Sequence, residues 1–587
     1  MKEYNLSQQN VESKKNSAFE TVRKLMALMG EERRNMFIAL IAILINATLS
    51  MIAPMLIGHT IDTYIATKQY HGVMVFSGIL LGMYLVALGT SYLQTILMGG
   101  VGQRMLYNLR NRLFNKLQEL PVDFFNQNKA GDLISRINND TDKLNQFFSQ
   151  YLMQFVNSIF SMLGAAIFLL SINLPLGAAA LFPALLVLIF TRIVSPWVKT
   201  RNAANMKSTG FMSAEIQESL NNFKLIVAFN RRDYFRKRFD EVNQDNYNTA
   251  LKAGLASSVF MPAYGLAANI GQLIIMSFGI YLITTGHFTI GLLISFLFYL
   301  NSFYNPLRQI ASVWTNFQIA LAGWDRIAQI LNMESNLVVN DKTCGKTSDV
   351  LLSFFKVSFR YDEDNEVLHQ VSFDLERGKT YAFVGPTGGG KTTTASLMAR
   401  LYDPVRGSVI FNGKDIRSMS HEERTHRIGF ILQEPFLFSG TVRDNILYAN
   451  PEMKDFNNDQ LMQALQESGL ESLLQVFDQG LDTSITSANE SISLGQKQLI
   501  AFMRAVLRKP DLLILDEATA NIDTVTEQLL DTILQKLPAT TTRVIIAHRL
   551  NTIENADEIY FVNSGEVSRA GSLDEAIKLL LEKEKRS

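Results

Sequence analysis

Long apolar segments fill the first 310 residues or so of the chain, whereas residues after about 350 alternate short apolar runs with polar stretches. Six of these segments approach or exceed the ~20 residues that an α-helix needs to cross a bilayer. They lie near residues 36–57, 73–99, 152–171, 174–194, 256–282 and 286–308. The pattern predicts six membrane-spanning helices followed by a mixed α/β domain.

The connections between the segments are of two kinds. The short connections at residues 171–175 and 283–289 contain no Lys or Arg, and the one after the first segment contains a single Lys. The two long connections are rich in both residues. Because cytoplasmic loops carry the excess of positive charge, we expect the long connections, both termini and the α/β domain to lie in the cytoplasm. This asymmetry argues against six buried core helices of a soluble protein.

Helical periodicity continues through the long connections. The stretch YNLRNRLFNKLQEL places apolar residues at about i, i+3, i+4 and i+7, so the membrane helices are predicted to extend into the cytoplasm. An extension of ~20 residues adds ~30 Å, enough to reach a separate domain. Two breaks, at residues 124–140 and 216–230, are the predicted turning points. No unpaired charged residue lies in the middle of a segment, so no ion or proton path is indicated.

The stretch GPTGGGKTT carries the clearest chemical motif. It fits G-x-x-x-x-G-K-[ST] and stands between the strand-like run TYAFV and the helix-like run TTASLMARL, which is the context that this motif requires. Glycines let the backbone curl so that N–H groups point at phosphates, while the lysine supplies charge and the threonine hydroxyl suits Mg²⁺. The predicted nucleotide-binding residues are Gly385, Pro386, Thr387, Gly388, Gly389, Gly390, Lys391, Thr392 and Thr393.

Five other residues are candidates for the same nucleotide site, although each alone is a weaker signal than the glycine-rich motif. Asp516 and Glu517 end the apolar strand DLLILDEAT, where one acid suits Mg²⁺ and the next suits the attacking water. His548 ends the strand-like run RVIIAH, and Gln433 follows another short strand. The histidine suits a γ-phosphate, with a structural role as the alternative, and the glutamine suits Mg²⁺ or water. Tyr361 precedes the glycine-rich loop and is predicted to stack on a nucleobase, with a buried strand tyrosine as the alternative.

Composition removes several classes of function. Lys plus Arg and Asp plus Glu both number 55, so net charge indicates no particular partner, and no nucleic-acid partner is expected. The one cysteine, Cys344, excludes an internal disulfide and a metal site built on cysteines. The polar first residues lack the short apolar core of a cleaved signal peptide.

These motifs, in this order, resemble those of ATP-binding cassette (ABC) transporters, and specifically of exporter half-transporters, over about residues 20–575. The most specific stretch is SISLGQKQLIAFMRAVLRKPDLLILDEATANIDT. The resemblance implies that Tyr361 stacks on the base, Gln433 is the loop glutamine, Asp516 holds magnesium, Glu517 activates water and His548 is the switch histidine.

The resemblance also implies residues that act across a dimer. Ser493, Gly495 and Gln496 match signature positions that reach a nucleotide held by the partner subunit, and Asp523 matches the dimer-contacting aspartate. The signature usually reads LSGGQ, but here it reads ISLGQ, with Leu494 in place of the first glycine. Leucine adds a branched side chain and a stiffer backbone where a close approach to phosphate is needed. A heterodimer with two unequal ATP sites is therefore expected, with a tolerated variant in a homodimer as the alternative.

The expected architecture is an α-helical membrane domain of six helices fused to an α/β P-loop ATPase domain of ABC type. Residues 1–35 form a cytoplasmic segment with an elbow helix, 36–332 the membrane domain, 333–349 a linker and 350–587 the nucleotide-binding domain.

The expected function is ATP-driven export across the plasma membrane of a bacterium, as half of a dimer, with ATP and Mg²⁺ as cofactors. The membrane half offers aromatics and methionines but no fixed charges, so apolar or amphipathic small molecules are the expected substrates, with membrane lipid around the helices. A lipid or peptide exporter is one alternative. An ATP-gated channel or a regulatory membrane ATPase is another, although a channel calls for a ring of pore charges that the sequence lacks. The six apolar segments exclude a soluble DNA-handling ATPase.

Overall fold

The computed structural model describes residues 4–6, 30–334, 349–361, 365–448, 450–486, 492–516, 530, 532–535, 537–546, 555–570 and 575. The chain forms two compact units. The helical unit comprises Asn10–Gln118 and Ala130–Asn332, and the α/β unit comprises Met1–Gln9, Glu119–Lys129 and Met333–Ser587. Most of the expected elbow-helix region and of the expected linker lies outside the described residues.

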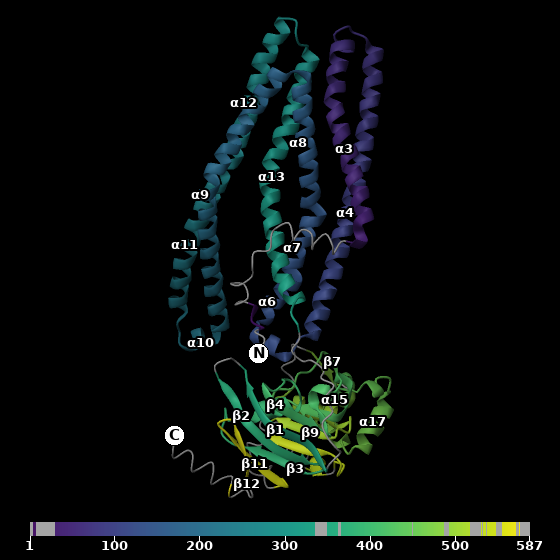
Figure 1. Cartoon of the computed structure of the whole chain (residues 1–587), viewed down its shortest axis with the longest axis vertical. Helices are drawn as coiled ribbons and strands as arrows, with labels where there is room; N and C mark the ends of the chain where they lie inside the picture. Colours follow the sequence, from purple (N-terminus) through teal and green to yellow (C-terminus); the bar gives the residue numbers. More distant parts are fainter. Residues whose placement is uncertain are drawn as a thin grey trace. The chain divides into compact units, whose positions relative to one another are not determined.

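The helical unit contains the six predicted spans, within long rods that Figure 1 shows in purple to teal. Each rod is long and apolar enough to cross a membrane, which confirms the prediction from the apolar segments. The rods run over Arg33–Ile65, Tyr70–Glu119, Ala130–Ile172, Leu174–Asn221, Arg232–Thr284 and Ile290–Leu331. Their helices are α3 (Arg33–Thr60), α4 (Tyr70–Glu119), α6 (Ala130–Ser135), α7 (Thr141–Gln146), α8 (Leu152–Ile172), α9 (Leu174–Asn221), α10 (Phe223–Ala228), α11 (Arg232–Ser258), α12 (Phe260–Thr284) and α13 (Ile290–Leu331).

The rods are much longer than a membrane is thick. Helix α4 has 50 residues, which corresponds to about 75 Å at 1.5 Å per residue, against the ~30 Å hydrocarbon core of a bilayer. The predicted extension of the membrane helices is therefore confirmed. Both predicted turning points are also present, as the short helices α5 (Val122–Gln127) and α10.

Helix α13 holds the centre of the helical unit, where it packs against α3, α8 and α12. The Tyr299 hydroxyl donates to the Met51 carbonyl at 2.6 Å, and the Tyr304 hydroxyl donates to the Ala180 carbonyl at 3.1 Å. These tyrosines therefore satisfy their polar ends within the helix bundle while their rings fill its core.

Helices α3 and α13 lie close together at two glycines, Gly58 and Gly291. The carboxylate of Asp62 accepts hydrogen bonds from the Gly291 amide at 2.8 Å and from the Thr289 hydroxyl at 2.5 Å. A Cβ at Gly291 would lie 2.0 Å from the Gly58 carbonyl oxygen. Small residues permit such close approach between membrane helices, so the α3–α13 contact depends on these glycines.

The most apolar stretch of α4 differs from that of α13. None of the α4 stretch is buried within the chain, whereas half of the α13 stretch is buried. Leu81, Leu85 and Leu88 on α4 are all largely exposed. An apolar helix face of this size needs lipid or another protein to cover it.

The α/β unit is built on a six-stranded sheet with the order β12-β11-β3-β10-β9-β6. Strands β6, β9, β10, β3 and β11 are parallel, and β12 is antiparallel to β11. All residues of β3 and β9 are buried, as expected of parallel strands covered on both faces. The strands are β3 (Thr380–Val384), β6 (Ile428–Ile431), β9 (Leu512–Asp516), β10 (Thr542–Ile546), β11 (Glu558–Asn563) and β12 (Glu566–Ala570).

A second, antiparallel sheet has the order β2-β1-β4-β5, and a small two-stranded sheet pairs β7 with β8. These strands are β1 (Val350–Arg360), β2 (Glu366–Glu376), β4 (Arg406–Phe411), β5 (Lys414–Asp415), β7 (Gly440–Thr441) and β8 (Ser484–Ile485). Besides α5, the α-helices whose bounds the structure gives within the described residues of this unit are α14 (Lys391–Met398), α15 (His421–Arg427), α16 (Val442–Leu447), α17 (Asn458–Glu467) and α18 (Leu494–Val506).

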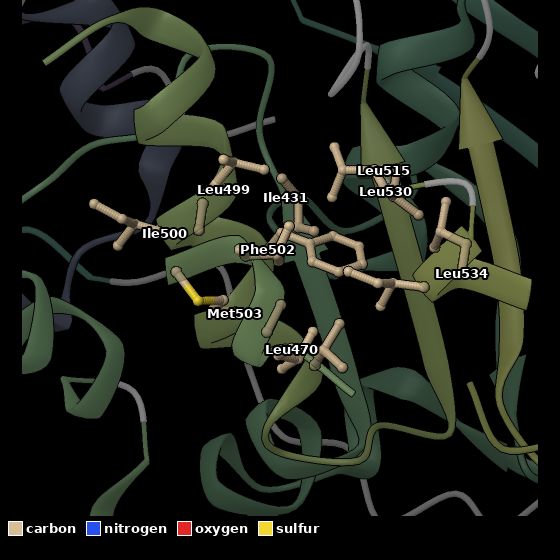
Figure 2. Close-up of a cluster of buried hydrophobic side chains, with 14 of the residues drawn as sticks. Ile431, Leu470, Leu499, Ile500, Phe502, Met503, Leu515, Leu530 and Leu534 are labelled. Carbon is tan, nitrogen blue, oxygen red and sulfur yellow. The ribbon is translucent and has the colours of Figure 1, made fainter. Parts of the chain in front are cut away.

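Helix α18 is anchored by the apolar core on one side of the parallel sheet. Figure 2 shows the ring of Phe502 among the side chains of Ile431, Leu515, Leu530 and Leu534. Since α18 begins one residue after Ser493, this core fixes the position of the signature segment relative to the strand that carries Asp516.

Substituting Gly291 with alanine should disturb the contact between α3 and α13. The added Cβ would overlap the Gly58 carbonyl, and overpacking of this kind costs roughly 1–3 kcal/mol. The matched control is Gly265→Ala on α12, because a Cβ there would meet nothing within 4 Å. Thermal unfolding of the purified protein in detergent should show a lower midpoint for Gly291→Ala than for Gly265→Ala, and equal midpoints would contradict this account of the contact.

Candidate nucleotide-binding site

The glycine-rich loop joins β3, which ends at Val384, to α14, which begins at Lys391. The predicted strand–loop–helix arrangement is thus present. Gly385, Gly388 and Gly390 have φ values of +147°, +81° and +108°, in a region of backbone conformation that glycine adopts far more readily than other residues. A Cβ at Gly385 would also lie 2.0 Å from the Val562 carbonyl oxygen. The loop can therefore take this course only with glycine at these positions.

Lys391 lies inside the curve of the loop. Its ammonium donates to the carbonyl oxygens of Gly385 at 2.7 Å and Pro386 at 3.0 Å, and the residue is 6% exposed. A buried positive charge at the first turn of α14 adds to the partial positive charge of the helix N-terminus. The loop is therefore suited to bind the phosphates of a nucleotide.

A hydroxyl and a carboxylate meet beside the loop. The Thr392 hydroxyl donates to the Asp516 carboxylate at 3.2 Å. Asp516 ends β9 and is 2% exposed. Mg²⁺ prefers oxygen ligands and is commonly held by one or two carboxylates together with substrate phosphates and water. This pair consequently fits the predicted magnesium position, although the described residues contain no cluster of three or more acidic, histidine or cysteine side chains.

Tyr361 lies in a cluster of three aromatic rings. It meets Phe359 and Tyr402 edge-on, at centroid distances of 4.9 and 5.3 Å, and its hydroxyl shares a 3.1 Å hydrogen bond with the Thr393 hydroxyl. Burial raises the pKa of the Tyr361 hydroxyl, against the opposing effect of the bond to Thr393, and burial raises the pKa of Tyr402 to about 12. Both phenols are therefore neutral at physiological pH, and Tyr361 stands beside the phosphate loop.

Tyr402 was not predicted from the sequence. It follows α14 without a motif, and its relation to Tyr361 becomes visible only when β1 and α14 are folded together. The hydroxyl of Tyr402 accepts a 2.5 Å hydrogen bond from the Asn126 side chain of α5. The aromatic cluster is thus joined to a segment 276 residues away in the chain.

The signature residues lie at the start of α18. The Ser493 hydroxyl accepts from the Gln496 amide at 3.2 Å, and the Gln496 side chain accepts from the Ser493 amide at 2.9 Å, which is a capping box. Leu494 and Gly495 are the first two helical residues, so Leu494 has an ordinary helical backbone. The feature that separates ISLGQ from LSGGQ here is therefore the leucine side chain in the first turn rather than backbone strain.

A hydrogen bond joins Gln433 to helix α18, which begins in the signature. The Gln433 carbonyl accepts a hydrogen bond from the Gln498 side chain at 3.3 Å, and Gln498 is 1% exposed. Among the predicted residues the structure thus brings Thr392 to Asp516, Tyr361 to Thr393 and Gln433 to α18. Glu517, Asp523 and His548 lie outside the described residues.

Two family models match the chain. Residues 36–307 match the model for the ABC transporter transmembrane region, and residues 368–520 match the ABC transporter model. Similarity to an uncharacterized ABC transporter ATP-binding protein, YfiC of Bacillus subtilis, extends over 95% of this chain and 92% of that protein at 31% identity. The chain belongs to the ABC transporter family.

Other relatives carry functional names. A fatty acid ABC transporter ATP-binding/permease protein of Mycobacterium tuberculosis is 33% identical over 84% of this chain and 77% of that protein. A multidrug resistance ABC transporter ATP-binding and permease protein of Lactococcus lactis subsp. cremoris is 30% identical over 85% of this chain and 84% of that protein. Both of these names state an ATP-binding part and a permease part, and all three relatives are from bacteria.

The family and the fold together confirm several expectations. The chain is an ABC exporter of the bacterial plasma membrane, with six spans and a cytoplasmic ATP-binding domain. That domain implies nucleotide binding and ATP hydrolysis coupled to transport. The predicted fold class, a six-helix membrane domain fused to an α/β ATPase domain of ABC type, is confirmed.

Replacing Lys391 with alanine should weaken ATP binding. Hydrogen bonds to charged groups contribute roughly 1.5–3 kcal/mol, so the dissociation constant should rise roughly 10- to 150-fold. Lys414→Ala is the control, because Lys414 is exposed and forms only a 3.7 Å ion pair with Glu423. Fluorescence titration with a nucleotide analogue measures both constants, and a Lys391→Ala constant equal to that of the control would remove the phosphate-binding role.

Proposed function

We propose that this chain is one half of a heterodimeric exporter that uses ATP and Mg²⁺ to move apolar or amphipathic small molecules out of the cell. A membrane domain at 36–332 would be joined by a linker at 333–349 to a nucleotide-binding domain at 350–587. The observation that carries the proposal is the combination, in one chain, of six apolar spans with the phosphate loop and the Thr392–Asp516 pair.

The proposed division of work at this chain's own ATP site combines the positions described above with the roles that the family resemblance implies for Glu517 and His548. Backbone N–H groups of Gly385–Thr393 bind the phosphates with Lys391, and Tyr361 stacks on the base. Thr392 and Asp516 hold Mg²⁺, which would neutralise charge on the phosphates. Phosphoryl transfer requires chiefly positioning and charge stabilisation, so Glu517 orients the attacking water. Two further residues complete the proposed site. Gln433 would contact Mg²⁺ or the attacking water, and His548 would contact the γ-phosphate.

The proposed dimer brings a second half-transporter's signature to this site. In return, Ser493, Gly495 and Gln496 would reach the nucleotide of the partner, and Asp523 would contact the partner chain. The exposed position of Ser493 supports this role, as do the first-turn amides of α18, of which the Gln496 amide is capped by the Ser493 hydroxyl, since helix N-termini bind anions. Leu494, in that same turn, supports two unequal sites because its side chain would stand between those amides and the partner's phosphate.

The proposed substrate class rests on the side chains of the membrane spans and on the names of two relatives. The membrane-spanning parts of the rods present apolar and aromatic side chains and few charges, and a relative is named for multidrug resistance. Another relative is named for fatty acids, so lipid export is the second candidate.

Flux into inverted membrane vesicles tests the proposal. Vesicles holding this chain and its partner should accumulate amphipathic cationic dyes such as ethidium against their gradient only when ATP and Mg²⁺ are present. Fluorescent fatty acids and short peptides serve as competing probes in the same vesicles. Passive flux that ATP only switches on would support a channel, and ATP hydrolysis without movement of any of the three probe classes would support a regulatory ATPase.

Glu517→Gln in the assembled transporter should abolish turnover but leave ATP binding intact, because the side chain keeps its size and loses the carboxylate charge. Loss of a positioned acid–base group typically lowers rates by 10²–10⁴-fold. The control is the corresponding substitution in the partner, which should leave most hydrolysis in place. Near-normal hydrolysis by Glu517→Gln would contradict the assignment of the competent site.

Purified alone, this chain should hydrolyse ATP slowly, and shortening Leu494 should raise the rate at least tenfold, since each homodimeric site would then combine Glu517 with an unobstructed signature. Leu494→Gly and Leu494→Ala form a matched pair. Because residue 494 is helical, both should raise ATPase activity if side-chain bulk is the obstacle. Fast ATPase activity of the unaltered chain alone, or no gain from either substitution, would contradict the heterodimer proposal.

A further inference from the structure

Three residues near the beginning of the chain, Tyr4, Asn5 and Leu6, lie against α5 within the α/β unit, and the first and last of them are buried. Tyr4 and Leu6 are each 1% exposed, although they belong to a polar stretch of sequence that predicts no such burial. Burial this deep in a polar segment indicates a specific contact rather than a loosely attached tail.

The side-chain amides of Gln127 and Asn128, at the end of α5, form hydrogen bonds with backbone N–H and C=O groups of this segment. The Gln127 oxygen accepts from the Tyr4 amide at 3.0 Å, and the Asn128 oxygen accepts from the Leu6 amide at 3.1 Å. The Asn128 nitrogen donates to the Tyr4 carbonyl at 2.8 Å and to the Phe124 carbonyl at 2.7 Å. One asparagine therefore holds both the segment and the last turn of α5.

The Tyr4 side chain extends this attachment. Its ring meets the fully buried ring of Phe124 edge-on, at a centroid distance of 6.4 Å. Its hydroxyl donates to the Glu334 carbonyl at 3.2 Å. Tyr4 thus links α5 to the residues that follow α13 in the sequence.

The same helix is held on another side by the aromatic cluster, because Asn126 donates to the Tyr402 hydroxyl and Tyr402 contacts Tyr361. Helix α5 has six residues, and isolated helices shorter than ~12–15 residues are marginal in water. Its structure and position must therefore come from these contacts.

We propose that Tyr4, Asn5 and Leu6 form a strap that positions α5 on the ATP-binding domain, so that α5 follows this domain when nucleotide binds. Residues 120–121 connect α5 to α4, and residues 128–129 connect it to α6, so displacement of α5 passes directly into two membrane rods. The strap rests on the proposed exporter function and deepens it. Tyr4 and Leu6 act through α5 and are positioning residues.

Hydrogen–deuterium exchange on the full, assembled transporter tests the strap directly. In the double variant Tyr4→Ala, Leu6→Ala, amide exchange in residues 122–128 should rise at least fivefold, while the dissociation constant for ATP stays within twofold. The control is Lys2→Ala, Glu3→Ala, which changes the same segment but keeps both anchoring side chains. The single variants Tyr4→Ala and Leu6→Ala should each raise exchange in residues 122–128 by less than the double variant does. They therefore test the strap even if the double variant folds poorly.

Rescue distinguishes positioning from general stabilisation. Adding the peptide MKEYNLSQQ to the double variant should restore protection of residues 122–128, and the same peptide with both anchoring residues changed to alanine should not. Protection in the variants equal to that in the control would overturn the strap, as would failure of the peptide to restore it.

The functional consequence is measured as dye accumulated per ATP hydrolysed in vesicles. The double variant should lose at least fivefold in this ratio with hydrolysis retained, and an unchanged ratio would overturn the coupling role. Absence of transport by the unaltered complex would instead count against the proposed function, and the exchange result would then decide the strap by itself.

Discussion

The hydrogen bond between Thr392 and Asp516 is the interaction on which the ATP-binding half depends. It joins the phosphate loop to the end of β9, so the groups suited to phosphate and to magnesium lie together. Three other features of this half hold that junction in place. Glycines with positive φ let the phosphate loop curve. The parallel sheet places β3, which precedes the loop, and β9, which ends at Asp516, in the same sheet. The core around Phe502 fixes α18 beside β6 and β9.

A second constraint comes from the membrane. Backbone polar groups cannot be left unpaired in lipid, so a chain of this kind crosses as helices. These helices are longer than a bilayer is thick, and the short helices α5 and α10 connect consecutive rods where the chain turns back. A displacement at one end of such a long helix is therefore transmitted to its other end. Helix α5 belongs to the α/β unit and is joined in sequence to two rods, so work done by ATP can reach the membrane through it. The contacts that hold α5 include the aromatic cluster at Tyr361 and the segment at Tyr4.

Features with a local signature were predictable from the sequence. Apolar length gave the six spans, periodicity gave their extensions, and glycine spacing between a strand and a helix gave the phosphate loop. Contacts between distant residues left no local pattern, which is why Tyr402, Asn126 and the burial of Tyr4 were missed. The effect of Leu494 on the ATP sites stays a prediction, and the structure adds that the backbone of this residue is helical and requires no glycine.

The central claim is that this chain's own phosphate loop forms the hydrolytic site of the transporter. Photolabelling with azido-ATP trapped by vanadate, followed by mapping of the labelled peptide, tests it most directly, because vanadate retains nucleotide only where hydrolysis has occurred. The account predicts label on this chain, in peptides around Tyr361 or the phosphate loop, with far less on the partner. Label confined to the partner subunit would contradict it.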